Sequence, residues 1–193
     1  MHASADLQQI QDAQAGDELA LQALFEQWLP TVMAWCARLG GPFVDPEDAA
    51  QDVLIRAFGK LPALRDPAAF DAWMFSLTRR VLAWHRRQVW LRRWMPGASV
   101  ERTDPDTGPE SRAASQEVAR RVHDILEDLA VAQREVVVLC CIEERTTAEV
   151  AHLIGVSQGT VKSRLQRGKS RFAAMARRRG LRPDAPTLIS VKS

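Results

Sequence analysis

The sequence has few cysteines, no long apolar run and no leader-like beginning. Its 193 residues include three cysteines, which is too few, and an odd number, for a complete disulfide framework. No uninterrupted apolar run reaches the roughly 18–20 residues that a membrane-spanning helix needs. Residues 1–6 have neither the basic start nor the apolar core of a signal peptide. These absences predict a cytoplasmic protein with reduced thiols and no membrane insertion.

The residue sets that usually carry catalysis or hold metals are also missing. The sequence has no phosphate-binding glycine loop, no Cys/His nucleophile set and no paired carboxylates beside a basic cleft. His85, His123 and His152 show no metal-ligand spacing with any cysteine. Cys140 and Cys141 are adjacent, so on a helix they point about 100° apart, and we expect them in the core. We therefore expect no enzyme, no metal and no cofactor.

What the sequence does have is an uneven distribution of charge, although its formal net charge is only +2. Residues 1–53 hold nine acidic residues and one basic, whereas residues 56–93 hold nine basic and two acidic. Residues 100–150 are acidic again, and residues 160–182 hold nine basic residues and no acidic one. Two basic blocks separated by acidic ones predict two polyanion-binding surfaces. The alternative is that these are solvated helix faces.

Apolar residues at three- and four-residue spacing predict helices in the first half of the chain, over residues 6–40, 45–61 and 67–94. Pro30 is expected to break or bend the first of these.

The second predicted helix begins with an acidic segment. Asp45 is a plausible cap before Pro46, which fits a first helical turn. Asp48 and Asp52 are four residues apart and project together, with Arg56 one turn further on. A basic partner surface would offset their mutual repulsion, which favours a docking face, although exposed acidic faces are common.

The third predicted helix combines aromatic and basic residues. Four tryptophans lie between residues 73 and 94, and the arginines beside them are Arg79, Arg80, Arg86 and Arg87. Aromatic rings next to arginines suit single-stranded nucleic acid, since each stacked base contributes about 1–3 kcal/mol. The alternative is that the tryptophans belong to the core.

Residues 95–116 show the clearest shift of composition in the chain. They contain three prolines, two glycines and several acidic residues, with almost nothing large and apolar. This composition predicts a flexible acidic linker between two small helical domains, so the expected fold class is all-α. The expected domains are residues 1–94 and 117–180, followed by a tail over 181–193.

The second domain contains the pattern of a helix-turn-helix. Thr146 and Glu149 have the spacing of a capping box, and Gly155 permits the tight turn between the two helices. Ser157 would cap the second helix, whose Val161 and Leu165 pack back on the first. In such a motif the N-terminal residues of the second helix reach base edges in the major groove. A protein-only three-helix module is the alternative.

Together these segments resemble a bacterial RNA polymerase sigma factor of the extracytoplasmic-function (ECF) type, over nearly the whole chain. Residues 45–58 resemble the core-polymerase-binding helix of that family, and residues 70–80 resemble the segment that melts and reads the promoter −10 element. Residues 154–165 are close to the helix-turn-helix that reads the −35 element. Two domains with a short linker and no further domain imply the ECF subgroup.

The resemblance implies three sets of site residues and their partners. The residues that dock on the coiled coil of the polymerase β′ subunit are Asp48, Gln51, Asp52 and Arg56. The residues that bind −10 DNA are Arg65, Phe70, Trp73, Arg79, Arg80, Trp84 and Arg87. The residues that bind −35 DNA are Ser157, Gln158, Thr160, Lys162, Ser163, Arg164 and Arg167.

Two further partners follow from the resemblance, and one departure from the family stands out. The last helices would hold the β-subunit flap, and an anti-sigma factor would be a further partner. The family often has Arg-Asn where this chain has Arg79-Arg80, so an amide that contributes to −10 contacts is replaced by a charge.

Other functions remain open from the residues alone. One is a helix-turn-helix regulator that works without polymerase and uses its N-terminal domain to sense or dimerise. A second is a nucleic-acid-modifying enzyme, which the missing catalytic sets disfavour. A third is a sigma mimic that sequesters an anti-sigma factor.

Overall fold

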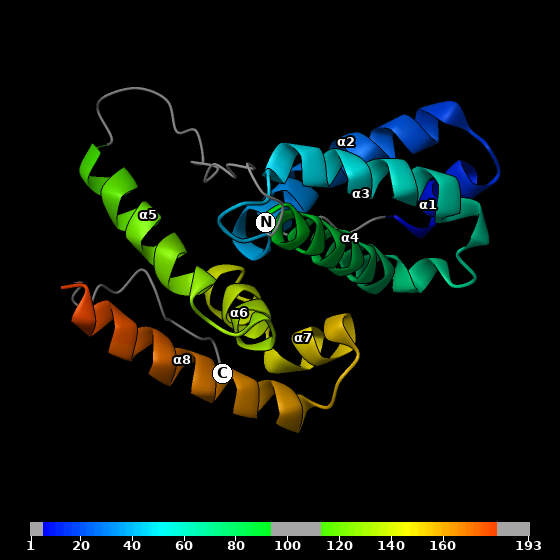
Figure 1. Cartoon of the computed structure of the whole chain (residues 1–193). Coiled ribbons are helices and arrows are strands. Elements are labelled where there is room, and N and C mark those ends of the chain that lie inside the picture. The colour runs from blue at the N-terminus through cyan, green and yellow to red at the C-terminus, as the bar shows by residue number, and fades with distance from the viewer. Residues whose placement is uncertain (1–5, 94–112, 181–193) are drawn as a thin grey trace. The chain divides into compact units, whose positions relative to one another are not determined.

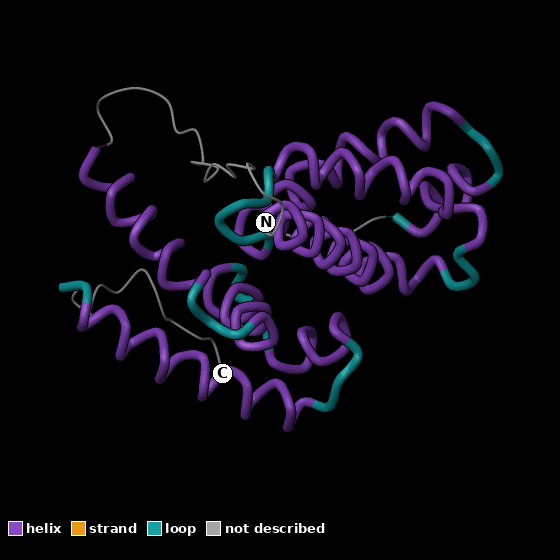
Figure 2. Tube along the Cα trace, viewed as in Figure 1, coloured by secondary structure: helices purple, strands orange, loops and turns teal. Residues whose placement is uncertain are grey.

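The computed structural model describes residues 6–93 and 113–180, which form helices joined by loops (Figures 1 and 2). The chain divides into two units, Met1–Thr103 (unit 1) and Asp104–Ser193 (unit 2). The predicted all-helical, two-domain fold is confirmed. Among the described residues, no helix is both long and apolar enough to cross a membrane.

The expected linker and tail are tested only at one edge. Residues 95–112 of the linker and the whole tail, 181–193, lie outside the described residues. The last linker residues already belong to helix α5, which begins at Ala113.

Unit 1 is built from four α-helices and two short 3-10 turns in its described part. The elements are α1 (Leu7–Gln14), α2 (Glu18–Leu39), α3 (Pro46–Lys60), η1 (Leu61–Ala63), η2 (Pro67–Ala69) and α4 (Phe70–Arg93). Helices α2, α3 and α4 pack on one another, and α1 covers α2 and both 3-10 turns.

An aromatic cluster forms the centre of unit 1. The indole of Trp28 lies 5.2 Å from the ring of Phe70, and Trp35 lies 4.9 Å from Phe75, both edge to face. All four side chains are at most 2% exposed. Edge-to-face pairs contribute about 0.5–1.5 kcal/mol each beyond the area that they bury. This cluster fixes how α2 and α4 pack, and with them the faces that they leave outside.

Of the break or bend expected at Pro30, the break is wrong, because α2 runs through this residue as one helix. Pro30 is exposed, so the carbonyl that loses its hydrogen bond four residues earlier can face water. The separation falls instead at Gly16, which has φ +95°. Asp17 then caps α2 by accepting from the backbone of Leu19 at 2.8 Å.

Some apolar residues of the predicted helices lie outside the core. Leu19 is 79% exposed and Leu29 43% exposed. Phe58 is 51% exposed, and its ring stacks on that of Phe25 with centroids 4.7 Å apart. The apolar residues at helical spacing in the sequence therefore include some that unit 1 leaves at its surface.

In the described part of unit 2, three helical segments precede the predicted helix-turn-helix in the sequence. The elements are α5 (Ala113–Glu127), α6 (Val131–Val137), the π-helical turn η3 (Val138–Ile142), α7 (Thr147–Ile154) and α8 (Gln158–Arg178). The fully buried apolar side chains are Ile125, Val136, Val138, Leu139, Cys140, Val150 and Val161.

Helices α6 and α8 meet at a glycine. A Cβ atom at Gly168 would lie 2.7 Å from Cγ2 of Val137, closer than carbon atoms approach without displacement. Gly168 thus sets the distance of α8 from the core of unit 2. The neighbouring Cys140 and Cys141 are buried, as predicted. Burial raises the pKa of the Cys140 thiol to about 11, so it stays protonated and inert near neutrality.

Candidate functional site

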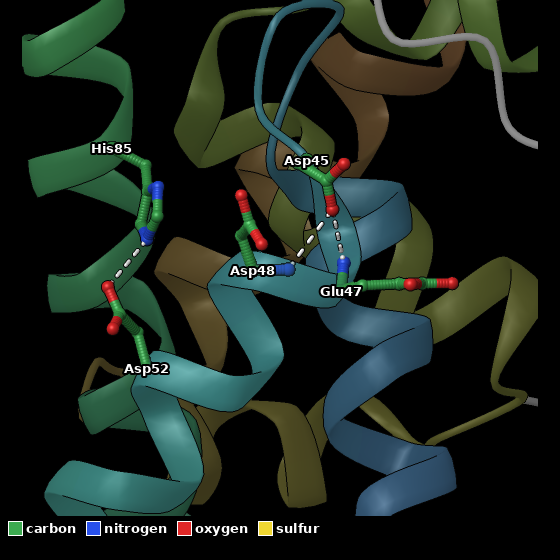
Figure 3. A network of polar contacts seen from close by, with 5 residues as sticks. All are labelled: Asp45, Glu47, Asp48, Asp52 and His85. Atoms are coloured by element: carbon green, nitrogen blue, oxygen red, sulfur yellow. Dashed lines mark hydrogen bonds and ion pairs between the residues drawn. The ribbon is translucent and has the colours of Figure 1, made fainter.

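The acidic face of α3 begins at a cap that its own sequence supplies. One carboxylate oxygen of Asp45 accepts from the backbone N–H of Glu47 at 2.8 Å and of Asp48 at 3.0 Å (Figure 3). Pro46 occupies the first turn, where no N–H is needed. Asp48 and Gln51 are exposed on the turns that follow.

The next acidic residue of α3 faces α4 rather than open solvent. His85 Nε2 donates to Asp52 Oδ2 at 3.0 Å, as Figure 3 shows. The side chain of Asp52 is 36% exposed and that of His85 17%. One turn further along α3, the Arg56 guanidinium lies 5.4 Å from the ring centroid of Trp84. Two of the four expected docking residues therefore contact α4.

The expected −10 residues are not all at the surface. Phe70 is 2% exposed and packs against Trp28, so it lies in the core of unit 1, and its part in −10 binding stays a prediction. Trp73 is half-buried with its ring 5.6 Å from Phe70. Trp84 is 44% exposed. The aromatic spacing of α4 could not separate these cases, because the helix offers aromatic residues to both its core and its outer face.

The arginines of this region also differ in position. Arg65, Arg80 and Arg87 are exposed, and Arg79 is half-buried. Arg86 Nη1 donates to the carbonyl of Leu39 at the end of α2, at 2.7 Å. Arg86 therefore stabilises a helix terminus, where a cation also suits the helix dipole.

In unit 2 the helix-turn-helix has the local geometry that its sequence predicts. Thr146 and Glu149 form the reciprocal capping box of α7, with backbone-to-side-chain distances of 2.7 and 3.2 Å. Gly155 adopts the left-handed conformation (φ 69°, ψ 40°) in the turn. Ser157 Oγ caps α8 by accepting from the backbone of Thr160 at 3.1 Å.

Helix α8 divides into a buried and an open face. Val161 and Leu165 pack into unit 2, with 0% and 8% exposure. The expected −35 residues lie on the remaining faces: Ser157, Gln158, Lys162, Ser163 and Arg167 are exposed, and Thr160 and Arg164 are half-buried.

Several of these residues are held in place within the helix-turn-helix itself. Gln158 Nε2 donates to Thr147 Oγ1 on α7 at 2.9 Å. Arg167 Nε donates to the carbonyl of Ser163 at 3.2 Å. Such contacts orient polar side chains at the start of α8, the part of a recognition helix that reaches base edges. The structure thus combines a helix-turn-helix unit with a helical unit that carries an acidic face and exposed arginines.

Comparison with known proteins gives the family. Residues 24–94 match Sigma-70 region 2 and residues 119–172 match Sigma-70, region 4. The RNA polymerase sigma-E factor of Streptomyces coelicolor is 34% identical over 153 residues, 77% of this chain and 83% of that protein. The ECF RNA polymerase sigma factor SigD of Mycobacterium tuberculosis is 29% identical over 169 residues, 84% of this chain and 80% of that protein.

Solved structures agree with the sequence comparison. CnrH, in complex with the cytosolic domain of CnrY, superposes with a TM-score of 0.66 at 26% identity, covering 91% of this chain and 99% of CnrH. RpoE of Bartonella quintana, in complex with the anti-sigma factor NepR, shares the fold with a TM-score of 0.62 at 22% identity, covering 81% and 96%. The chain belongs to the ECF-type RNA polymerase sigma factors. It is a non-enzymatic factor that directs promoter-specific transcription initiation through regions 2 and 4.

Proposed function

We propose that the two regions divide promoter recognition, with unit 1 melting and reading the −10 element and unit 2 reading the −35 element. The observation that carries this proposal is the shared face of α3 and α4. There an acidic helix and a basic, tryptophan-bearing helix pack side by side in one small unit. The acidic helix suits a basic protein surface, and the basic helix with its tryptophans suits an unpaired DNA strand. A factor that brings polymerase to a promoter has to bind both.

The residues of this chain that dock on the coiled coil of the polymerase β′ subunit are Asp48, Gln51, Asp52 and Arg56. Asp48 and Gln51 are exposed, and Asp52 keeps 36% of its side chain accessible while His85 holds it. Two carboxylates four residues apart repel each other by a few tenths of a kcal/mol on a helix. A basic partner surface would attract both carboxylates and offset that repulsion, which supports a protein rather than DNA as the partner of this face.

The −10 surface consists of the accessible members of the expected set: Arg65, Arg80, Trp84 and Arg87, with Trp73 and Arg79 at its half-buried edge. An exposed indole offers a stacking platform for one unpaired base, and the arginines offer charge to the phosphates. Arg80 supplies charge where the family often has an amide. We therefore expect a −10 preference that differs from that of members with asparagine there.

The −35 surface is the open face at the start of α8. Gln158 and Lys162 stand where a recognition helix reaches base edges, and Arg164 and Arg167 are placed for phosphates. The absence of acidic residues from 160–182 supports DNA as the ligand of this face.

Two further partners belong to the same proposal. The end of unit 2 would hold the β-subunit flap, which sets the two DNA surfaces at promoter spacing. CnrH and RpoE were each solved with a bound protein, which in the case of RpoE is an anti-sigma factor. We expect a comparable regulator for this chain. As a polymerase subunit it would act in the cytoplasm, where the chromosome is transcribed.

The test is run-off transcription from a promoter library by bacterial core polymerase, with and without this protein. Transcripts that need the protein and start downstream of a shared two-part motif would support the proposal and reveal the promoter. No transcript, together with a dimer footprint on palindromic DNA by the free protein, would support a polymerase-independent regulator. No transcript, with tight binding to an anti-sigma factor, would support a sigma mimic.

A further inference from the structure

Gln14, the last residue of α1, holds the turn that follows α3. Its Nε2 donates to the carbonyl of Leu61 at 3.0 Å and to that of Leu64 at 2.7 Å. An amide nitrogen carries two hydrogens, so these two carbonyls use its whole donor capacity. The partners lie 47 and 50 residues away in the sequence, which makes this a tertiary contact.

The turn that Gln14 holds presents an exposed arginine. Leu61 opens η1, and the backbone N–H of Leu64 closes it by donating to the Leu61 carbonyl at 3.0 Å. Arg65 follows at once and is exposed. Asp66 then caps η2. The backbone of Arg65 is therefore fixed on both sides, and on one side the support comes from α1.

Helix α1, which carries Gln14, is anchored by packing in the core of unit 1. Ile10 and Ala13 are 1% and 4% exposed, and α1 packs against α2, η1 and η2. The helix precedes residues 24–94, the part that matches Sigma-70 region 2. The support for Arg65 thus comes from outside the matched region.

We propose that Gln14 is a positioning residue for promoter recognition, because it fixes the backbone from which Arg65 reaches promoter DNA. The inference rests on the proposed function, in which Arg65 contacts the −10 region. Without the two hydrogen bonds the apolar anchors of α1 remain, but the backbone before Arg65 can move. The arginine then spends less time in contact with the DNA.

The experiment compares holoenzymes made with the wild type, Gln14→Leu, Arg65→Ala and the double variant. Binding to a promoter fragment is measured over a range of salt concentrations. Arg65→Ala is expected to lower the affinity and, for a phosphate contact, to reduce the slope of log affinity against log salt by about one. Gln14→Leu is expected to show part of both changes. In the Arg65→Ala background it should change neither.

Controls separate positioning from general stability. Gln11→Leu alters an exposed glutamine of the same helix and should leave affinity and slope at wild-type values. Gln14→Glu places a carboxylate against two carbonyl oxygens and should cost at least as much affinity as Gln14→Leu. If Gln14→Leu does not fold, Gln14→Asn, which keeps the amide on a shorter arm, takes its place in the comparison.

Three outcomes decide the inference. Loss of the Gln14→Leu effect in the Arg65→Ala background supports positioning. An equal loss in both backgrounds overturns it, since Gln14 would then act on unit 1 as a whole. A wild-type holoenzyme that binds no promoter overturns the proposed function, whereas normal wild-type binding with additive losses overturns only the role of Gln14.

Discussion

The two units present their candidate binding residues in different ways. In unit 1 most of these residues come from α3 and α4, two helices that contact each other through Asp52 and His85 and through Arg56 and Trp84. In unit 2 they come from the start of one recognition helix, and the Lys162 side chain makes no hydrogen bond or ion pair within the described residues. Residues that share contacts give non-additive substitution effects, whereas separate residues give additive ones. The comparison therefore predicts an interlocked surface on unit 1, where substitutions have non-additive effects, and an open surface on unit 2, where their effects add.

The largest expected effect is on polymerase binding by α3. Asp48→Lys and Asp52→Lys should each lower the affinity for core polymerase by about 2 kcal/mol or more, because like charges then meet across the interface. Asp52→Lys should also lower the melting temperature of unit 1 by breaking the contact with His85, and Asp48→Lys should lower it through the helix dipole alone, since Asp48 lies in the first turn of α3. Affinity is measured by titrating labelled protein into core polymerase, and melting by tryptophan fluorescence.

Glu47→Lys is the matched control for these charge reversals. It changes the same charge in the first turn of α3, but the Glu47 side chain points away from Asp48 and Asp52 (Figure 3). It should bind core polymerase almost as the wild type does. Unchanged affinity in Asp48→Lys would refute the docking assignment.

The next effect concerns the open face of α8. Lys162→Ala and Arg167→Ala should each weaken −35 binding by the holoenzyme, by about 1–3 kcal/mol where the side chain reads a base. A phosphate contact would instead weaken all sequences alike and reduce the salt slope by about one. The double variant should equal the sum of the single variants. Arg178→Ala removes the same charge at the far end of α8 and serves as the control; strong coupling between the first two would contradict an open surface.

The two units should behave alike where stability depends on local caps. Asp45→Ala in unit 1 and Thr146→Ala in unit 2 each remove a side-chain cap, and each should cost about 1 kcal/mol of unfolding free energy. All six tryptophans lie between residues 28 and 94. Tryptophan fluorescence in urea therefore reports unit 1 alone, and far-UV circular dichroism adds unit 2. A cap whose removal changes neither signal would not stabilise its helix.

These caps are also what the sequence predicts best. Asp45 and Thr146 act on residues two and three positions away, so the spacing of the sequence already contains the geometry. Gly155 and Ser157 belong to the same local class. The starts of α3 and α7 and the helix-turn-helix were predictable for this reason.

Contacts between distant segments could not be predicted in this way. His85 meets Asp52 across 33 residues and Arg86 meets Leu39 across 47, and no periodicity encodes such pairs. The resemblance to the family assigns Phe70 to the −10 set, and only the structure shows that its ring packs against Trp28 in the core. Which of the expected site residues are buried, and which contact another helix, therefore needed the tertiary structure.

The smallest expected effect tests the interlocked surface itself. A double-mutant cycle of Arg56→Gln and Trp84→Leu should give a coupling energy of about 0.5–1 kcal/mol in the stability of unit 1, the size of a cation–π contact at an exposed site. The stability is measured by circular dichroism in urea, because Trp84→Leu removes a fluorophore. A cycle of Arg65→Gln, an exposed arginine outside both helices, with Trp84→Leu is the matched control and should give no coupling. If both cycles are additive, Arg56 and Trp84 are independent neighbours. Polymerase bound at Arg56 would then leave the stacking surface of Trp84 unchanged. Coupling in the first cycle alone would mean that engaging Arg56 also changes how Trp84 is held for DNA.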